Sequence, residues 1–138
     1  MNPAAKPWVA KQAMGSKVRG VALVASDGFS ARYDLDREAG TFCRPTHKLA
    51  GQSYKDRIIV LDTAKGGVAS AWMLREMASR GIVPLALVFN SVNPIIAQGA
   101  AFGGITLVAG FEGDITAQIP HCATVEIDPA TRTVRVVE

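Results

Sequence analysis

The stretch RIIVLDTAKGGVASAWMLREMASRG, residues Arg57–Gly81, decides the fold of this chain. Its apolar run Ile58–Leu61 predicts a buried strand, and the residues that follow the loop predict a helix over about Ala69–Arg80, ended by Gly81. A strand that runs through a glycine-bearing loop into a helix places free backbone N–H groups and the positive end of the helix dipole at one point. The order therefore predicts a place where an anion can bind.

Apolar segments on the C-terminal side extend this unit. Pro84–Asn90 predicts a second buried strand, and two strands joined by a helix indicate a parallel βαβ unit. Pro94–Ala101 predicts a short helix and Ile105–Ala109 a third strand. Because parallel strands need both faces covered, we expect an α/β fold: a three-layer β/β/α domain with a central βαβαβ unit.

The two ends of the chain are predicted to supply the second β layer. Val18–Ala25 reads as an apolar strand, and Thr124–Ile127 with Thr133–Val137 as a hairpin. The segment Met1–Lys17 carries two prolines and small residues, which predicts a loose arm ahead of a domain over residues 18–138.

The predicted helix over residues 69–80 is amphipathic. Its apolar side chains can share one face, which we expect to be buried: Ala69, Trp72, Met73, Leu74 and Met77.

Composition narrows the function classes. A length of 138 residues with 49% apolar residues suits one domain with a real core, and no apolar stretch reaches bilayer length, so we expect a soluble cytoplasmic protein with no membrane partner. The net charge of +3 comes from scattered basic residues, which argues against nucleic-acid binding. Cys43 and Cys122 have no metal-ligand spacing and are expected to be buried free thiols, while His47 and His121 have no second ligand nearby in sequence, so no metal site is expected.

The loop after the first buried strand is the main candidate site. Its backbone N–H groups and the charge of Lys65 would hold an anion, Gly66 and Gly67 would allow a close approach, and Asp62 and Thr63 lie beside them. The alternative is an ordinary turn in which Asp62 or Thr63 caps backbone groups and Lys65 is solvated. The residues alone leave both open, and the spacing matches neither a P-loop nor a dinucleotide-binding fingerprint.

Three further residues are expected near this loop. Asn93 precedes Pro94 and can cap the helix that begins there, or it can bind a ligand at the same sheet edge. Arg44 and His47 lie in a polar loop; they either anchor that loop or add positive potential beside the anion site. No nucleophile, metal centre or acid–base pair accompanies these residues, so we expect the other half of the site on a different polypeptide.

The motifs together resemble the small, swivelling subunit of aconitase X enzymes. The resemblance runs from about Val18 onward and is carried by the pattern from Pro45 to Ser53, by the strand–loop–helix, and by NPIIAQGA at Asn93–Ala100. It implies a swivelling β/β/α fold and a hydro-lyase acting on a small anionic hydroxy acid. It also implies a large-subunit partner that carries an iron or iron–sulfur centre, with no cofactor on this chain. Family activities include dehydration of cis-3-hydroxy-L-proline and of mevalonate 5-phosphate.

The loop departs from the family pattern at one place. Family members with assigned activity carry a stretch resembling GRGSSSGS, in which one serine is taken to be the catalytic base. In an ungapped alignment Lys65 replaces the arginine and Gly66 matches, but Gly67, Val68 and Ala69 occupy the serine positions. The resemblance therefore implies substrate binding by Lys65 and Gly66. It leaves Lys65 and Ser70 as candidate catalytic residues. It also leaves open a non-catalytic regulatory subunit, altered lyase or isomerase chemistry, or a standalone small-molecule binder.

Overall fold

The computed structural model describes residues 7–30, 34–64 and 67–137 of the chain. Its elements in chain order are β1 (Trp8–Val9), β2 (Gln12–Met14), β3 (Val18–Val24), β4 (Leu35–Asp36), β5 (Thr41–Phe42), β6 (Ile58–Thr63), α1 (Val68–Arg80), β7 (Ala86–Ser91), α2 (Pro94–Phe102), β8 (Thr106–Ala109), α3 (Ile115–Gln118), β9 (Thr124–Asp128) and β10 (Thr133–Val136).

The main sheet joins a parallel half to an antiparallel half at β3. Within the described residues its strand order is β1-β10-β9-β3-β6-β7-β8-β2, and β4 with β5 forms a separate two-stranded sheet. Strands β3, β6, β7 and β8 are mutually parallel, whereas β9 pairs antiparallel with both β3 and β10. The predicted βαβαβ unit and the predicted C-terminal hairpin are both confirmed.

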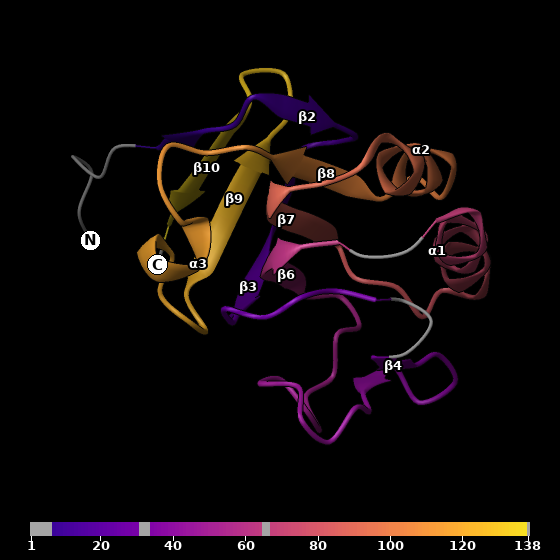
Figure 1. The fold of residues 1–138 in the computed structure, drawn as a ribbon. Helices are drawn as coiled ribbons and strands as arrows, with labels where there is room; N and C mark the ends of the chain where they lie inside the picture. Colours follow the sequence, from indigo (N-terminus) through magenta and orange to yellow (C-terminus); the bar gives the residue numbers. More distant parts are fainter. Residues whose placement is uncertain (1–6, 31–33, 65–66, 138) are drawn as a thin grey trace.

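The parallel strands are buried on both faces, which produces the predicted three layers. Along β6, Ile59 and Leu61 join a core that includes Leu74 of α1, whereas Ile58 and Val60 join a second core with the strands of the antiparallel half. Successive side chains of a strand point to opposite faces, so an uninterrupted apolar run fills both cores. Figure 1 shows α1 and α2 on one side of the parallel strands and β9, β10 and α3 on the other.

The N-terminal segment is a correction to the sequence-based expectation. The loose arm expected over residues 1–17 is wrong for residues 8–14, because β1 pairs with β10 and β2 pairs with β8. Each strand has only two or three residues and carries no clear alternation of its own. Edge strands of this kind are fixed by the partner strand rather than by their own pattern.

Two residues of α1 that were expected on its buried face are exposed. Leu74 and Met77 are buried as expected and Met73 is partly buried, but Trp72 is 61% exposed and Ala69 is also exposed. Trp72 precedes Leu74 by two positions, or roughly 200° around a helix of 3.6 residues per turn, so the two side chains cannot share one face. The expected burial of the cysteines is also wrong, since Cys43 and Cys122 both lie exposed in loops.

Candidate functional site

The parallel strands end at one edge of the sheet (Figure 1). There β6, β7 and β8 are followed by α1, α2 and α3, whereas β3 is followed by the segment that holds β4 and β5. The first helix, α1, begins after Gly67, which is its N-cap and supplies no side chain; no cap hydrogen bond from a described side chain replaces it. A Cβ placed on Gly67 would meet no atom within 4 Å. No described side chain therefore caps the first turn of α1, and the place a Cβ of residue 67 would take is open.

Two predicted site residues in this loop, Lys65 and Gly66, lie outside the described residues. A third, Ser70, is part of α1, but its side chain also lies outside the described part of the chain. The anion site at this loop therefore stays a prediction.

Side chains at the ends of β6 and β7 contact each other and the start of α3. The Asn90 amide Nδ2 donates to Asp62 Oδ1 at 2.9 Å and to Asp114 Oδ1 at 2.7 Å, and its Oδ1 accepts from the Ile115 N–H at 2.7 Å. The hydrogen bonds from Asn90 and Thr116 lower the pKa of the Asp114 carboxyl. One amide therefore links the exposed carboxylate of Asp62 to the start of α3.

The other polar residues of this edge are engaged in local hydrogen bonds. The Ser91 hydroxyl donates to Thr63 Oγ1 at 3.1 Å, so Thr63 bridges β6 and β7. Asn93 Oδ1 accepts from the Ile96 N–H at 2.9 Å, and Pro94 occupies the first turn of α2. This is the capping role that the sequence offered for Asn93.

Arg44 is held by two carboxylates. Its Nε donates to Asp34 Oδ1 at 2.6 Å and its Nη2 to Asp27 Oδ1 at 3.3 Å, and the hydrogen bond to Asp34 raises the pKa of the guanidinium. Since both acids lie against it, the positive potential that Arg44 could add to the anion site is largely compensated locally.

His47 anchors the same loop. Its side chain is fully buried, Nε2 lies 2.8 Å from the carbonyl oxygen of Gly28, and Nδ1 accepts from the Leu49 N–H at 3.0 Å. With Nδ1 accepting, the ring proton is on Nε2 and is donated to Gly28. The ring also stacks on Phe42 with centroids 4.8 Å apart. This geometry matches the loop-anchoring alternative for His47.

The Arg44–His47 loop reaches the candidate site through the turn at residues 26–30. The carbonyl oxygen of Asp27 accepts from the Asp62 N–H at 2.8 Å, and the Phe29 N–H donates to the Thr63 carbonyl at 2.8 Å. The turn therefore runs beside the end of β6, and the Arg44–His47 loop fixes that turn from outside. Arg44, through Asp27, and His47, through Gly28, are thus linked to the end of β6.

The pH dependence of stability tests the contribution of the Asp27 carboxylate to the turn at residues 26–30. Burial raises the pKa of Asp27, but hydrogen bonds from the backbone N–H groups of Lys48 and Gly28, with the charge of Arg44, lower it overall. A depressed pKa gives stability that is complete above the unfolded value of about 3.9 and is lost as pH falls through the folded pKa. We expect Asp27→Asn to lower the free energy of unfolding by about 1–2 kcal/mol at pH 7. Urea unfolding between pH 7 and pH 3 should show that the difference in unfolding free energy between wild type and variant shrinks below about pH 4. A difference that stays constant over this range would contradict the stabilising role of the Asp27 carboxylate.

A family model described as the aconitase X swivel domain matches residues 7–136. The chain belongs to this family. The match begins ahead of β1, so the aconitase X swivel domain includes the N-terminal strands that the sequence-based resemblance left out.

Curated relatives and a solved structure agree with this assignment. The chain is 28% identical over 114 residues to the phosphomevalonate dehydratase small subunit of Methanocella arvoryzae (83% of this chain, 86% of the relative). It is 30% identical over 107 residues to that of Methanopyrus kandleri (78% and 79%). The crystal structure of Thermococcus kodakaraensis aconitase X superimposes with a TM-score of 0.88 at 21% identity, covering 96% of this chain and 99% of that one. The swivel fold is therefore confirmed.

Three acidic residues of this swivel domain were missed from the sequence. Asp27 and Asp34 compensate Arg44, and Asp114 completes the link through Asn90. A signal existed for Asp114, because it follows the apolar strand β8 and precedes Ile115 and Thr116 as an N-cap does. No sequence spacing marks Asp27 and Asp34, whose partner Arg44 lies 17 and 10 residues away.

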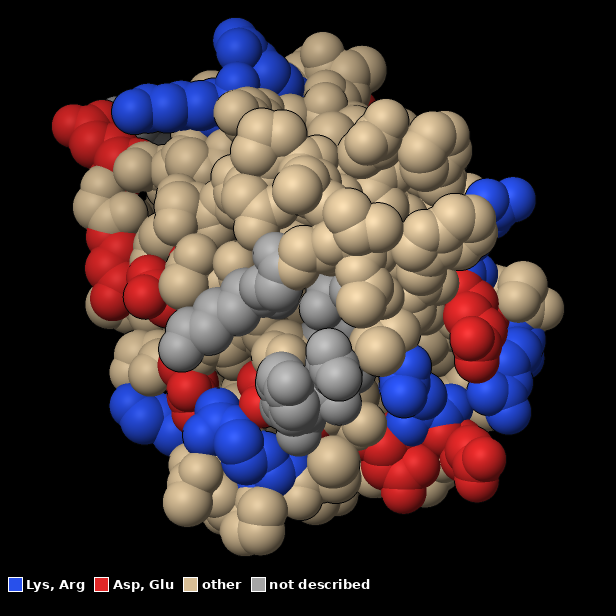
Figure 2. Space-filling view, turned by 45° about the vertical axis from the view of Figure 1, so that its right-hand side comes forward, with Lys and Arg blue, Asp and Glu red and all other residues tan. Residues whose placement is uncertain are grey.

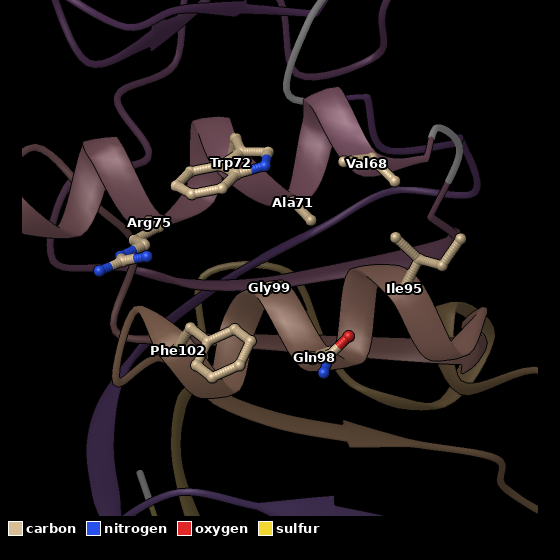
Figure 3. A pocket seen from close by; sticks show the side chains of 8 residues that line it. All are labelled: Val68, Ala71, Trp72, Arg75, Ile95, Gln98, Gly99 and Phe102. Atoms are coloured by element: carbon tan, nitrogen blue, oxygen red, sulfur yellow. The ribbon is translucent and has the colours of Figure 1, made fainter.

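A groove lies between the two helices that cover the sheet (Figure 3). It has a volume of about 160 Å³ and is lined by Val68, Ala71, Trp72, Arg75, Ile95, Gln98, Gly99 and Phe102. Its lining is mostly apolar, so it does not resemble an anion site.

Across residues 7–30, 34–64 and 67–137 no group of three or more His, Cys, Asp or Glu side chains could hold a metal ion. The described part of the chain does not fit the iron or iron–sulfur centre that the family implies, which the resemblance assigns to the large subunit. None of the helices that the structure describes is long and apolar enough to span a membrane.

Proposed function

We propose that the chain is the small subunit of an aconitase X-type hydro-lyase that acts on a small anionic hydroxy acid. In this proposal the loop between β6 and α1 binds the anionic group, and the domain closes over a site that a large subunit completes. The observation that carries it is the start of α1, where no described side chain caps the helix and a Cβ on Gly67 would meet no atom within 4 Å. The small-subunit names of the relatives support the same assignment.

The edge of the sheet offers complementary groups for the two ends of such a substrate. The N–H groups of the first turn of α1, with Lys65 beside them, attract a phosphate or carboxylate. The exposed carboxylate of Asp62, oriented by Asn90, can accept a hydrogen bond from a hydroxyl group. Closure of the domain would exclude water and strengthen both contacts.

The proposal also has to name the group that takes the proton, because the family serine is absent from this chain. The three family serine positions hold Gly67, Val68 and Ala69, which carry no oxygen or nitrogen in their side chains. Lys65 and Ser70 remain the proposed candidates on this chain. A lysine acts as a base once its surroundings depress its pKa, which closure against a large subunit would favour.

Co-expression tests the proposal directly. The chain is produced with the aconitase X-type large subunit of the same genome, and the purified complex is assayed for dehydration of mevalonate 5-phosphate and of cis-3-hydroxy-L-proline. We expect a stable heteromer and product formation only when both chains are present. Failure to form a complex, or full activity of the large subunit alone, would remove the assignment.

Substitution of Lys65 tests its part in the anion site. We expect Lys65→Ala to lower kcat/KM of the complex by about 10- to 100-fold, chiefly through KM, because a charged hydrogen bond contributes about 1.5–3 kcal/mol. Lys55→Ala, a change at an exposed lysine in the loop ahead of β6, is the matched control and should keep wild-type kinetics. Unchanged kinetics for Lys65→Ala would exclude the ammonium from binding.

A second candidate function is a binding or regulatory subunit that keeps the fold and lacks the base. The apolar residues at the serine positions favour it, and altered lyase or isomerase chemistry by Lys65 is the third candidate. Gly67→Ser separates them. A gain of dehydration activity would favour the degenerate subunit, whereas loss of an existing activity would favour altered chemistry.

A further inference from the structure

We propose that the outer face of α1 and α2 is the surface through which this chain docks on its large subunit. The helical docking face is defined by the side chains that flank the groove between the helices: Val68, Trp72, Arg75, Ile95, Gln98 and Phe102. The inference rests on the proposed function, since it names the surface that the partner covers.

Exposed apolar side chains gather on this face. Among the described residues five large hydrophobic side chains are exposed, and four of them belong to the helical docking face. Val68 is 62% exposed, Trp72 61%, Ile95 43% and Phe102 68%. Figure 2, turned so that the helix side comes forward, shows a broad uncharged expanse with charged side chains around its margin. A contiguous apolar patch with a charged rim is typical of a protein interface.

The groove has the form of a socket for an apolar side chain. Its floor is where the helices touch, because a Cβ on Gly99 would lie 2.6 Å from the Cα of Ala71. Trp72 and Phe102 rise on either side (Figure 3). The Arg75 guanidinium lies 5.4 Å from the centroid of the Trp72 ring, which holds the indole in place and leaves donors for an acceptor on the partner. Aromatic residues and arginine around a pocket are the usual composition of an interface hot spot.

The position of the face selects the large subunit as the occupant. Val68 follows Gly67 directly and begins α1, and Ile95 is the second residue of α2, so both lie at the helix ends that meet the candidate site. A large subunit that covers the candidate site therefore lies next to the end of the helical docking face. A second copy on the same face would occupy the place from which the large subunit must close.

Charge insertion tests the face with a matched control. We expect Trp72→Glu and Phe102→Glu to weaken binding of the purified large subunit at least about thirtyfold in titration calorimetry, the loss that corresponds to a hot-spot residue. Val9→Glu is the control, because Val9 is 57% exposed in β1, on the opposite β layer, and should bind within about twofold of wild type. All three changes lie at exposed positions, and circular dichroism verifies that each variant is folded.

The outcomes separate this inference from the proposed function. Wild-type affinity in both helix variants overturns the docking face, while the proposed function stands. No binding by the wild-type chain removes the proposed function and the docking face together. A homodimer of the isolated chain that Trp72→Glu dissolves, with large-subunit binding unchanged, identifies a second copy as the occupant and overturns the inference.

Discussion

The Gly67→Asp variant is expected to lose about 100- to 1000-fold of kcat/KM in the two-subunit complex. The new side chain would occupy the space over the first turn of α1, where a Cβ on residue 67 would meet no atom within 4 Å. Its carboxylate would accept hydrogen bonds from the N–H groups that the substrate needs, and its charge would repel an anion. Aspartate at this position is also a good N-cap, so the fold should be kept or slightly stabilised.

Steady-state kinetics and thermal unfolding, measured on the same variant, distinguish a blocked anion site from a damaged fold. A raised Tm with lost activity identifies the first turn of α1 as the anion site, since a damaged fold would lower both. Gly67→Asn is the matched control: it fills the same space and caps the helix without a charge, so the difference between the two variants isolates the electrostatic part. Wild-type kcat/KM in Gly67→Asp would place the substrate elsewhere.

The sequence predicted the fold well because the decisive pattern is local and repeated. Each parallel strand is a short apolar run that fills two cores, as Ile58–Leu61 does, and each connecting helix has a recognisable end, such as Gly81 in the left-handed conformation (φ 74°) or Asn93 as a cap. These features depend on neighbours in sequence. The short strands β1 and β2 depend instead on β10 and β8, which lie about a hundred residues further along the chain.

The sequence predicted the sheet edge at which the candidate site lies, but not the side-chain pairs around it. The ends of neighbouring parallel strands lie at one edge of a sheet, and the 2.9 Å hydrogen bond from Asn90 to Asp62 shows that the ends of β7 and β6 do so. Arg44 and His47 were placed near this edge, but their partners Asp27 and Asp34 could not be identified, because pairing through loops leaves no periodic signal. A charged residue in a polar loop looks the same in sequence whether it is compensated or free.

Trp72 shows a different kind of failure, with a consequence for function. An apolar side chain on an amphipathic helix is ordinarily assigned to the core. Here the core face is set by Leu74 and Met77, and the tryptophan is left outside beside Arg75. Large exposed apolar side chains lower the solubility of a free domain. A partner that covers them explains why they are present. The misassigned residue is therefore the one that marks the helical docking face.

The Gly99→Val variant is expected to lose about 2–3 kcal/mol of unfolding free energy and about 10 °C in Tm. A Cβ at this position would meet the Cα, Cβ and carbonyl oxygen of Ala71 at 2.6, 2.7 and 3.0 Å. Two of these are backbone atoms of α1, which a side-chain rotation cannot move away. The helices would have to separate, and α1 would lose part of its packing on the core beneath it.

Helix propensity makes the sign of this result informative. Valine is a better helix former than glycine by about 0.4 kcal/mol, so without the contact to Ala71 the substitution would stabilise α2. Ala101→Val, at an exposed position of the same helix, is the control and should cost only about 0.6 kcal/mol. Urea unfolding of both variants decides between the two effects. A Gly99→Val chain as stable as wild type would mean that α1 and α2 yield freely at their crossing, and the floor of the groove between them would then not be rigid enough to shape a docking socket.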